Sequence, residues 1–144
     1  MSLLRRNLVK SLAIFCGASM GNKPAHKEMA AATAQLLAQR GITLVYGGGN
    51  VGLMGVIADQ TLAHGGKVIG VIPKFLAEKE VAHTGLSEIH FVDTMHERKA
   101  LMANLADGFL ALPGGYGTLD EFCEILTWAQ VGLHHKPIGI LNAA

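Results

Sequence analysis

Short apolar runs alternate with longer segments of helical periodicity along this chain, and no other feature limits its fold as strongly. Apolar runs of four to six residues have the length of buried strands. Strands that alternate with helices predict βαβ units and a parallel sheet that is covered on both faces. The predicted strands are residues 12–16, 42–46, 67–72, 89–92, 109–112 and 137–141. The predicted helices are residues 25–40, 53–64, 95–106 and 119–132, and residues 73–87 are expected to form a loop with one short helix.

Glycine and proline positions support these boundaries. Pro24 suits a first helical turn, and Gly41, Gly65 and Gly108 follow predicted helix ends, where C-caps are expected. At 144 residues the chain has the length of one domain, and its 50% hydrophobic and 16% charged residues argue against disorder. We therefore predict a single α/β domain over residues 1–144.

Charge and cysteine content limit the classes of function. Twelve basic and 11 acidic residues give a net charge of +1 without a basic stripe. This argues against strong electrostatic binding to nucleic acid or to a membrane, and no run is long enough to span one. Cys16 and Cys123 show neither metal spacing nor a disulfide framework, so we expect a cytoplasmic protein with both cysteines in its core. His134 and His135 lack further ligands at metal spacing, which favours a surface loop.

The sequence also allows predictions about the two ends of the chain. Arg5 and Arg6 precede an apolar run that faintly resembles a signal peptide, but the run is too short and Gly17 breaks it. The last predicted strand is followed only by residues 142–144. A parallel sheet normally covers such a strand with another helix, so we expect a truncated end or a covering element from elsewhere.

The stretch from Pro113 to Glu121 carries the clearest chemical signal. It follows a predicted strand, contains three glycines and leads into a predicted helix. Such a turn lets backbone N–H groups approach a phosphate, which the helix dipole also favours. Glu121 then places a carboxylate near the bound anion. In the alternative interpretation, Thr118 and Glu121 form a capping box and the glycines serve only a tight turn.

Three further turns also follow predicted strands, so a parallel sheet would bring all four to one edge. In the first, Ser19 and backbone N–H groups could hold a nucleotide, or the turn is an ordinary βα connection. The second, residues 47–52, matches the dinucleotide fingerprint, but no acidic residue closes the next strand, which argues against NAD. In the third, Thr94 and Glu97 form a candidate capping box, and the cations that follow oppose the helix dipole. A substrate anion would compensate for these cations, Arg98 and Lys99; the alternative is a solvated surface pair.

Together these motifs resemble the Lonely Guy (LOG) family of cytokinin riboside 5'-monophosphate phosphoribohydrolases, which are often mislabelled as lysine decarboxylases. The resemblance covers essentially the whole chain, and Ala18 replaces a serine that is frequent in the family. It rests on four segments in order: residues 16–19, 45–55, 95–99 and 113–121.

The resemblance implies a Rossmann-like, doubly wound parallel sheet, a homodimer, and hydrolysis of the N-glycosidic bond of purine nucleoside 5'-monophosphates without a cofactor or metal. It maps the catalytic pair onto Arg98 and Glu121. Together with the turns described above, it gives as substrate- and phosphate-binding residues Ser19, Gly47, Gly48, Glu80, Lys99, Gly114, Gly115, Tyr116, Gly117, Thr118 and Thr127. Either adenine or a prenylated adenine remains open as the base.

Two other classes of function are compatible with such a fold. A nucleotide carrier or sensor would need the phosphate site but no catalytic carboxylate, and a DNA-binding protein is disfavoured by the near-neutral charge. A lysine decarboxylase would need a Schiff-base lysine with an acidic partner for the cofactor ring, and nothing marks one. From the sequence we also expect a dimer interface near Trp128 and Met102, and little loss of stability on removing Arg98 or on replacing Glu121 by glutamine.

Overall fold

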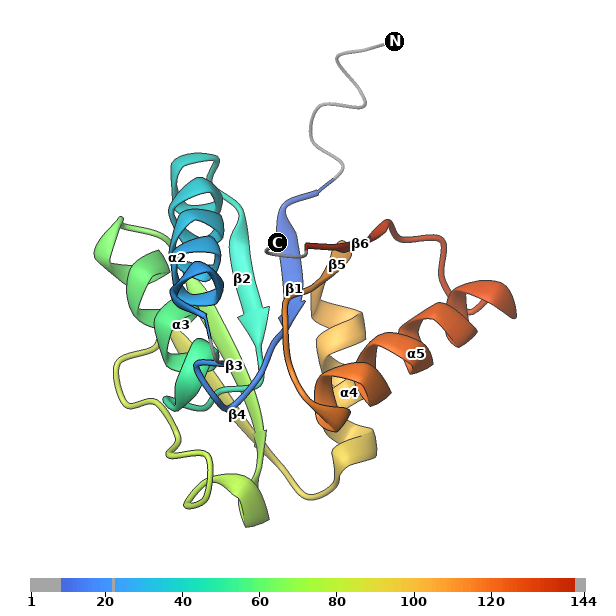
Figure 1. Ribbon diagram of the computed structural model, residues 1–144. Helices are drawn as coiled ribbons and strands as arrows, with labels where there is room; N and C mark the ends of the chain where they lie inside the picture. The colour runs from blue at the N-terminus through green and yellow to red at the C-terminus, as the bar shows by residue number, and fades with distance from the viewer. Residues whose placement is uncertain (1–8, 22, 142–144) are drawn as a thin grey trace, which may run out of the picture.

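The computed structural model describes residues 9–21 and 23–141. Within them, six strands form one sheet in the order β4-β3-β2-β1-β5-β6, and every neighbouring pair is parallel (Figure 1). The strands are β1 (Ser11–Phe15), β2 (Thr43–Tyr46), β3 (Val68–Pro73), β4 (Glu88–Val92), β5 (Gly108–Ala111) and β6 (Ile138–Ile140). The helices are α2 (Pro24–Gln39), α3 (Gly52–Ala63), α4 (Met95–Leu105), α5 (Tyr116–Gln130) and the 3₁₀ turn η1 (Lys74–Leu76).

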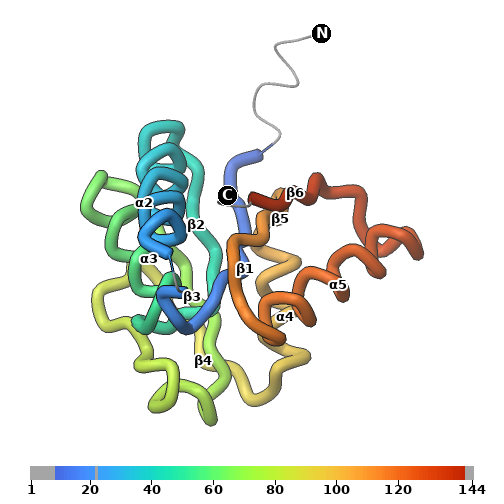
Figure 2. The backbone as a smooth tube through the Cα atoms, in the orientation of Figure 1, coloured from blue at the N-terminus to red at the C-terminus, as the bar shows by residue number. Residues whose placement is uncertain are grey.

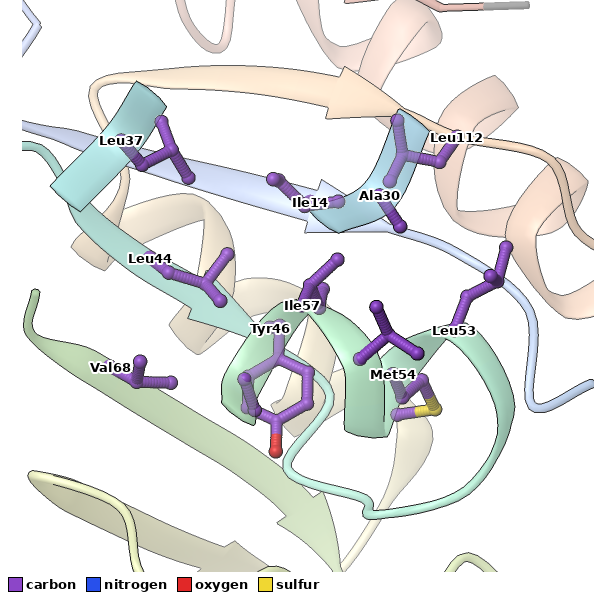
Figure 3. Close-up of a cluster of buried hydrophobic side chains, with 12 residues drawn as sticks. Ile14, Ala30, Leu37, Leu44, Tyr46, Leu53, Met54, Ile57, Val68 and Leu112 are labelled. Carbon is purple, nitrogen blue, oxygen red and sulfur yellow. The ribbon is translucent and has the colours of Figure 1, made fainter. Parts of the chain in front are cut away.

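Helices cover both faces of the sheet, as predicted: α2 and α3 lie on one side, and α4 and α5 on the other (Figure 1). Alternate residues of β1 enter the two layers, because successive side chains of a strand point to opposite faces. Ile14 joins the cluster with α2 and α3, whose buried members are drawn in Figure 3. Ala13 and Phe15 join the cluster that includes Met102 of α4 and Ile125 of α5.

The predicted strands are confirmed to within one residue at each end, and Pro24 begins α2 as expected. The last helix differs, since α5 begins at Tyr116 with Gly115 as its N-cap. The predicted capping box of Thr118 and Glu121 is therefore wrong, because Thr118 already lies inside the first turn. Gly41 and Gly65 have positive φ angles beyond helix ends, but Gly108 is part of β5 rather than a cap.

The strand order reverses between β1 and β5. From β1 the chain moves outward through β2, β3 and β4, and then returns to place β5 on the other side of β1. Figure 2 shows the connections after β1, β2 and β5 on the same edge of the sheet. Gly17 N donates to Pro113 O at 3.2 Å, which joins the loops after β1 and β5. Ligands bind at such a reversal in open α/β sheets.

The expectations for Arg5, Arg6 and residues 142–144 lie outside the described residues. Across residues 9–21 and 23–141, no helix combines the length and apolar character needed to cross a membrane.

Candidate active site

A cavity of about 360 Å³ lies at the carboxyl edge of the sheet, where the strand order reverses. It is lined by residues from β1 and from the loops and helices that follow β1, β2, β3, β4 and β5. The lining residues are Ile14, Phe15, Cys16, Gly17, Ala18, Gly47, Met54, Leu76, Glu80, Met95, Arg98, Gly115, Gly117, Thr118 and Glu121. The convergence of the glycine- and charge-rich turns predicted from the sequence is thus confirmed.

Arg98 lines this cavity and is buried, with 4% of its surface exposed. Its Nε donates to Val71 O at 3.0 Å, and Nη2 donates to Gly47 O at 2.6 Å and to Glu80 Oε1 at 3.0 Å. Val71 lies within β3, and Gly47 directly follows β2, the strand that pairs with β3, so the guanidinium is held by the main chain of the sheet. The interpretation of Arg98 as a solvated surface cation is wrong, because it is anchored in the interior.

The start of α4 is fixed by the predicted capping box. Glu97 N donates to Thr94 Oγ1 at 3.1 Å, and Asp93 N donates to Glu97 Oε2 at 2.9 Å. The first bond satisfies a backbone donor that the helix N-terminus leaves without an intrahelical partner, and the second ties the Glu97 side chain back to the residue before the N-cap. The cap therefore determines where α4 begins, and with it the position of Arg98 at the end of the first helical turn.

Gly47 is required by the placement of Arg98. A Cβ atom at Gly47 would overlap the guanidinium group and would lie 2.7 Å from Met54 Cε. Both neighbours belong to the cavity wall, so a side chain here would displace Arg98 or Met54. The glycine at the start of the turn after β2 thus leaves room for the Arg98 guanidinium.

Glu121 faces the same cavity from α5. Burial raises the pKa of its carboxyl group to about 7, against an opposing effect of Arg98 and with added repulsion from Glu80 and Asp120. A carboxyl group with a pKa near neutral pH can exchange a proton with substrate or water under physiological conditions. This property distinguishes Glu121 from an ordinary surface carboxylate.

The loop between β5 and α5 provides a candidate anion site. A Cβ atom at Gly115 or Gly117 would meet nothing within 4 Å, so these backbone segments border open space. Thr118 is buried and lines the cavity beside them. The N–H groups at the start of α5 have no intrahelical acceptors, and the helix dipole favours an anion there.

Other predicted binding residues do not line the cavity. Lys99 binds Asp120 and Glu124 of α5, while Thr127 is exposed and donates to Cys123 O at 2.9 Å. Tyr116 is 92% exposed. Gly48 and Gly114 allow close packing inside their loops. A Cβ atom added at Gly48 would lie 3.1 Å from Ile72 Cβ, and one added at Gly114 would lie 2.7 Å from Thr118 Cβ. Ser19 accepts a hydrogen bond from Gly21 N at 3.2 Å, which stabilises its own turn.

The apolar wall of the cavity was not predicted. Met54, Leu76 and Met95 line it beside the charged groups. Met54 and Met95 lie within motifs noted above, but their orientation depends on tertiary packing, and no sequence signal marks Leu76. Thioether side chains adapt to ligands of different shape, so this wall suits the base of a nucleotide.

The two cysteines occupy different environments. Cys16 is partly buried and lines the cavity, whereas Cys123 is exposed on α5, so the prediction of a core position is wrong for Cys123. Burial, together with the nearby Glu121 carboxylate, raises the pKa of the Cys16 thiol. Cys16 therefore remains an uncharged thiol at neutral pH.

Comparison with known proteins places the chain in a family. A family model described as "Possible lysine decarboxylase" matches residues 54–144. A cytokinin riboside 5'-monophosphate phosphoribohydrolase of Rhodococcoides fascians is 52% identical over 134 residues, which are 92% of this chain and 68% of the relative. The cytokinin riboside 5'-monophosphate phosphoribohydrolase LOG of Oryza sativa subsp. japonica is 49% identical over 138 residues. The chain belongs to the LOG family.

The resemblance seen in the sequence is thus confirmed. The match to the rice LOG protein covers 96% of this chain and 57% of the relative. A further LOG-family relative in Arabidopsis thaliana is 52% identical over 134 residues, and the match covers 61% of its length. The chain therefore spans less than two thirds of these plant relatives.

Solved structures confirm the Rossmann-like fold expected for a LOG-family chain. A Moco carrier protein from Chlamydomonas reinhardtii has a TM-score of 0.73 at 21% identity, covering 91% of this chain and 75% of that one. A molybdenum cofactor binding protein from Rippkaea orientalis has a TM-score of 0.74 at 23% identity, covering 93% and 77%. At such identities the likeness concerns the fold alone.

Proposed function

We propose that this chain hydrolyses the N-glycosidic bond of purine nucleoside 5'-monophosphates, releasing the base and ribose 5-phosphate. The observation that carries the proposal is the meeting of Arg98 and Glu121 in one cavity beside the glycine-lined start of α5. The relatives named for action on cytokinin riboside 5'-monophosphates support the same reaction. Both adenine and N6-prenylated adenine belong to the proposed substrate class.

In this proposal the phosphate binds at the N-terminus of α5, next to Gly115, Gly117 and Thr118. Binding the phosphate away from the reacting bond holds the sugar in place. The translational and rotational entropy that the reaction requires is then lost on binding, which lowers the barrier of the chemical step. The base then lies against the apolar wall formed by Met54, Leu76 and Met95. No described lining residue is a lysine, which disfavours Schiff-base decarboxylation despite the description of the family model.

The chemistry proposed for Glu121 follows from its charge and position. As the C1'–N bond lengthens, positive charge builds on the ribose, and a carboxylate stabilises it. Glu121 accepts a proton from the attacking water, whose oxygen forms the new bond to C1'. The electron pair of the broken bond leaves with the base, which takes up a proton from solvent, while Glu121 later returns its proton to solvent. The buried guanidinium of Arg98 keeps a positive charge beside the site throughout.

The test is incubation of the purified protein with AMP and isopentenyladenosine monophosphate, with free base and ribose 5-phosphate quantified. Release from the monophosphates, but not from adenosine or isopentenyladenosine, is the expected result. Equal rates with and without the phosphate would contradict the role of the α5 N-terminus. Tight nucleotide binding without any release of base would instead support the carrier or sensor alternative.

We also propose that the protein is a cytoplasmic homodimer, with no role for nucleic acid or membranes. The predicted position of the interface needs correction, because Met102 is 1% exposed and Trp128 packs against the same core cluster. Exposed apolar side chains are found instead on α5 and directly after it: Leu119, Leu126, Val131 and Leu133. Light scattering at micromolar concentration should give the mass of a dimer, and replacing Leu126 and Leu133 by serine should give a monomer.

A further inference from the structure

The loop after β3 brings Glu80 to the cavity. Its main chain is joined to the turn after β2, since Asn50 N donates to Glu80 O at 3.0 Å and His83 N donates to Gly48 O at 2.9 Å. Gly49 and Ala82 form an antiparallel bridge between the same two segments. Through this connection the Glu80 carboxylate reaches Arg98 Nη2 at 3.0 Å.

Val81, the next residue, shows that the loop is under strain. Its φ angle is +52°, and it is the one residue other than glycine with positive φ in the described chain. A β-branched residue is strongly disfavoured in this left-handed region, and it persists there only where the surroundings hold it. Contacts of the residues before and after Val81 must therefore hold the loop in this conformation. Glu80 makes such contacts before Val81, and His83 makes them after it.

His83 provides a side-chain contact that fixes the loop to helix α3. Its side chain is only 9% exposed, and Nε2 lies 2.6 Å from Asp59 Oδ1. Gly85 N donates to His83 Nδ1 at 2.9 Å, so Nδ1 is the acceptor and Nε2 carries the proton that Asp59 accepts. Both ring nitrogens are thus used, and the ring orientation is fixed.

We propose that the His83–Asp59 hydrogen bond is a positioning latch, which holds Glu80 against Arg98 from outside the cavity. Asp59 is 60% exposed on α3 and contributes no lining to the cavity, so it acts only through His83 and the strained loop. Arg98 keeps its anchors on Gly47 O and Val71 O without the latch, whereas Glu80 depends on the loop. Loosening the latch should therefore move Glu80 away and leave Arg98 in place.

The charge of Glu121 reports the position of Glu80. The groups that act on its carboxyl are Arg98 and Lys99 from α4, Glu80 from the loop and Asp120 from α5 itself, with the Cys16 thiol nearby. When Glu80 moves away, its repulsion is lost and it no longer neutralises Arg98. Both changes favour the charged form of Glu121, so the pKa of Glu121 should fall.

The test compares Asp59→Ala with Asp59→Asn. Asparagine still accepts the hydrogen bond of His83 Nε2 but has no charge, so it separates the latch from a direct electrostatic effect. Glu88→Ala is the matched control, because Glu88 is an exposed carboxylate on β4 that also binds a histidine, His90, at 2.9 Å. The pKa of Glu121 is measured by carboxyl ¹³C NMR on the ligand-free proteins, and the pH profile of AMP cleavage is measured in parallel.

We expect the pKa of Glu121 to fall by about one unit in Asp59→Ala, the scale for a change in one neighbouring charge. The acidic limb of the rate profile should move with it, while Asp59→Asn and Glu88→Ala match the unmodified protein. His83→Ala should reproduce Asp59→Ala. An unchanged pKa in Asp59→Ala, with or without a lower melting temperature, would overturn the latch, as would equal shifts in Asp59→Ala and Asp59→Asn.

The kinetic part of this inference rests on the proposed hydrolase function, whereas the NMR part does not. If the unmodified protein releases no base from any monophosphate, the proposed function fails. The pKa comparison among the variants then still decides whether the latch positions Glu80.

Discussion

Lys99 Nζ lies 3.3 Å from Asp120 Oδ2, and so joins the residue that follows Arg98 to the residue that precedes Glu121. The same ammonium group binds Glu124, one turn further along α5. Burial lowers the pKa of Lys99, but hydrogen bonds to Glu124 and Asp120 outweigh this effect and raise it. The ion pairs thus set the spacing of the two helices that carry the proposed catalytic pair.

Replacing Lys99 by methionine should reduce stability and turnover with little change in KM. Lys99 is 11% exposed and Glu124 20%, so removing the cation leaves the partly buried Glu124 carboxylate without its partner, with the more exposed Asp120 carboxylate nearby. A loss of about 1–3 kcal/mol in the free energy of unfolding is expected. Denaturant titration and steady-state kinetics measure both effects. A large rise in KM at unchanged stability would instead indicate the substrate contact that the family resemblance implies.

Replacing Arg98 by alanine should lower the rate by roughly 10²–10³, the scale for removing one stabiliser of transition-state charge. The structure reverses the expectation that stability would hold or rise. The change leaves Glu80 without its ion pair and the carbonyls of Val71 and Gly47 without the arginine donor, so a loss of about 3–5 kcal/mol is expected. The double variant Arg98→Ala, Glu80→Ala should recover part of it. Undiminished turnover in folded Arg98→Ala would remove Arg98 from the mechanism.

The sequence predicts the sheet well because most strands are short apolar runs followed by a glycine or charged turn. These signals are local: the period of the apolar residues, the glycines of positive φ and the capping box of Thr94. Local signals can be recognised without knowledge of the tertiary packing. Parallel pairing then follows from the helical crossovers. This is why the carboxyl edge, and with it the cavity, could be placed before the structure.

The orientation of charged side chains could not be predicted in this way. Arg98 and Lys99 are adjacent in sequence, yet one enters the cavity and the other faces α5, because neighbouring residues of a helix point about 100° apart. Glu80 lies in an irregular loop whose course is fixed by tertiary hydrogen bonds. The start of α5 was also misplaced, because Gly115 supplies a backbone cap that has no side-chain signature.

Gly117 offers a test of the anion site that spares the fold. Because nothing lies within 4 Å of a Cβ atom there, Gly117→Ala should be tolerated, and alanine in a helix is more stable than glycine by about 0.5–1 kcal/mol. The added methyl group would nevertheless occupy space next to the proposed phosphate. We expect KM for AMP to rise at least several-fold with an unchanged or higher melting temperature. Normal KM would place the phosphate elsewhere.

Gly47→Ala is the contrasting variant. Its Cβ atom would overlap the buried guanidinium group of Arg98, so both stability and turnover should fall. The loss of turnover should approach that of Arg98→Ala if Gly47 serves to place the guanidinium. Turnover that survives in the folded fraction would show that Arg98 acts from more than one position.

Replacing Glu121 by glutamine separates its charge from its shape. The sequence suggested little loss of stability from this change, but in the structure Glu121 has no capping partner, because Gly115 and not Thr118 is the N-cap of α5. Since burial raises the pKa of Glu121 from 4.5 to about 7, the folded protein holds more protons than the unfolded chain between these values. Stability should therefore fall as pH rises from 4.5 to 7 and stay at the lower level above it.

Glu121→Gln should lack this decline. Between pH 4 and pH 8 the free energy of unfolding of the unmodified protein should therefore fall by up to about 3 kcal/mol more than that of the variant. Turnover of the unmodified protein should rise with pH through about 7, because a general base must be ionised. The variant should lose roughly 10²–10⁴ in kcat while it still binds AMP, since the anion site precedes residue 121. Calorimetric melting from pH 4 to 8, with kinetics and nucleotide titration, measures all three. A variant with parallel melting curves and normal kcat would mean that Glu121 is neither the titrating group nor the base, and Glu80 would be the next carboxylate to test.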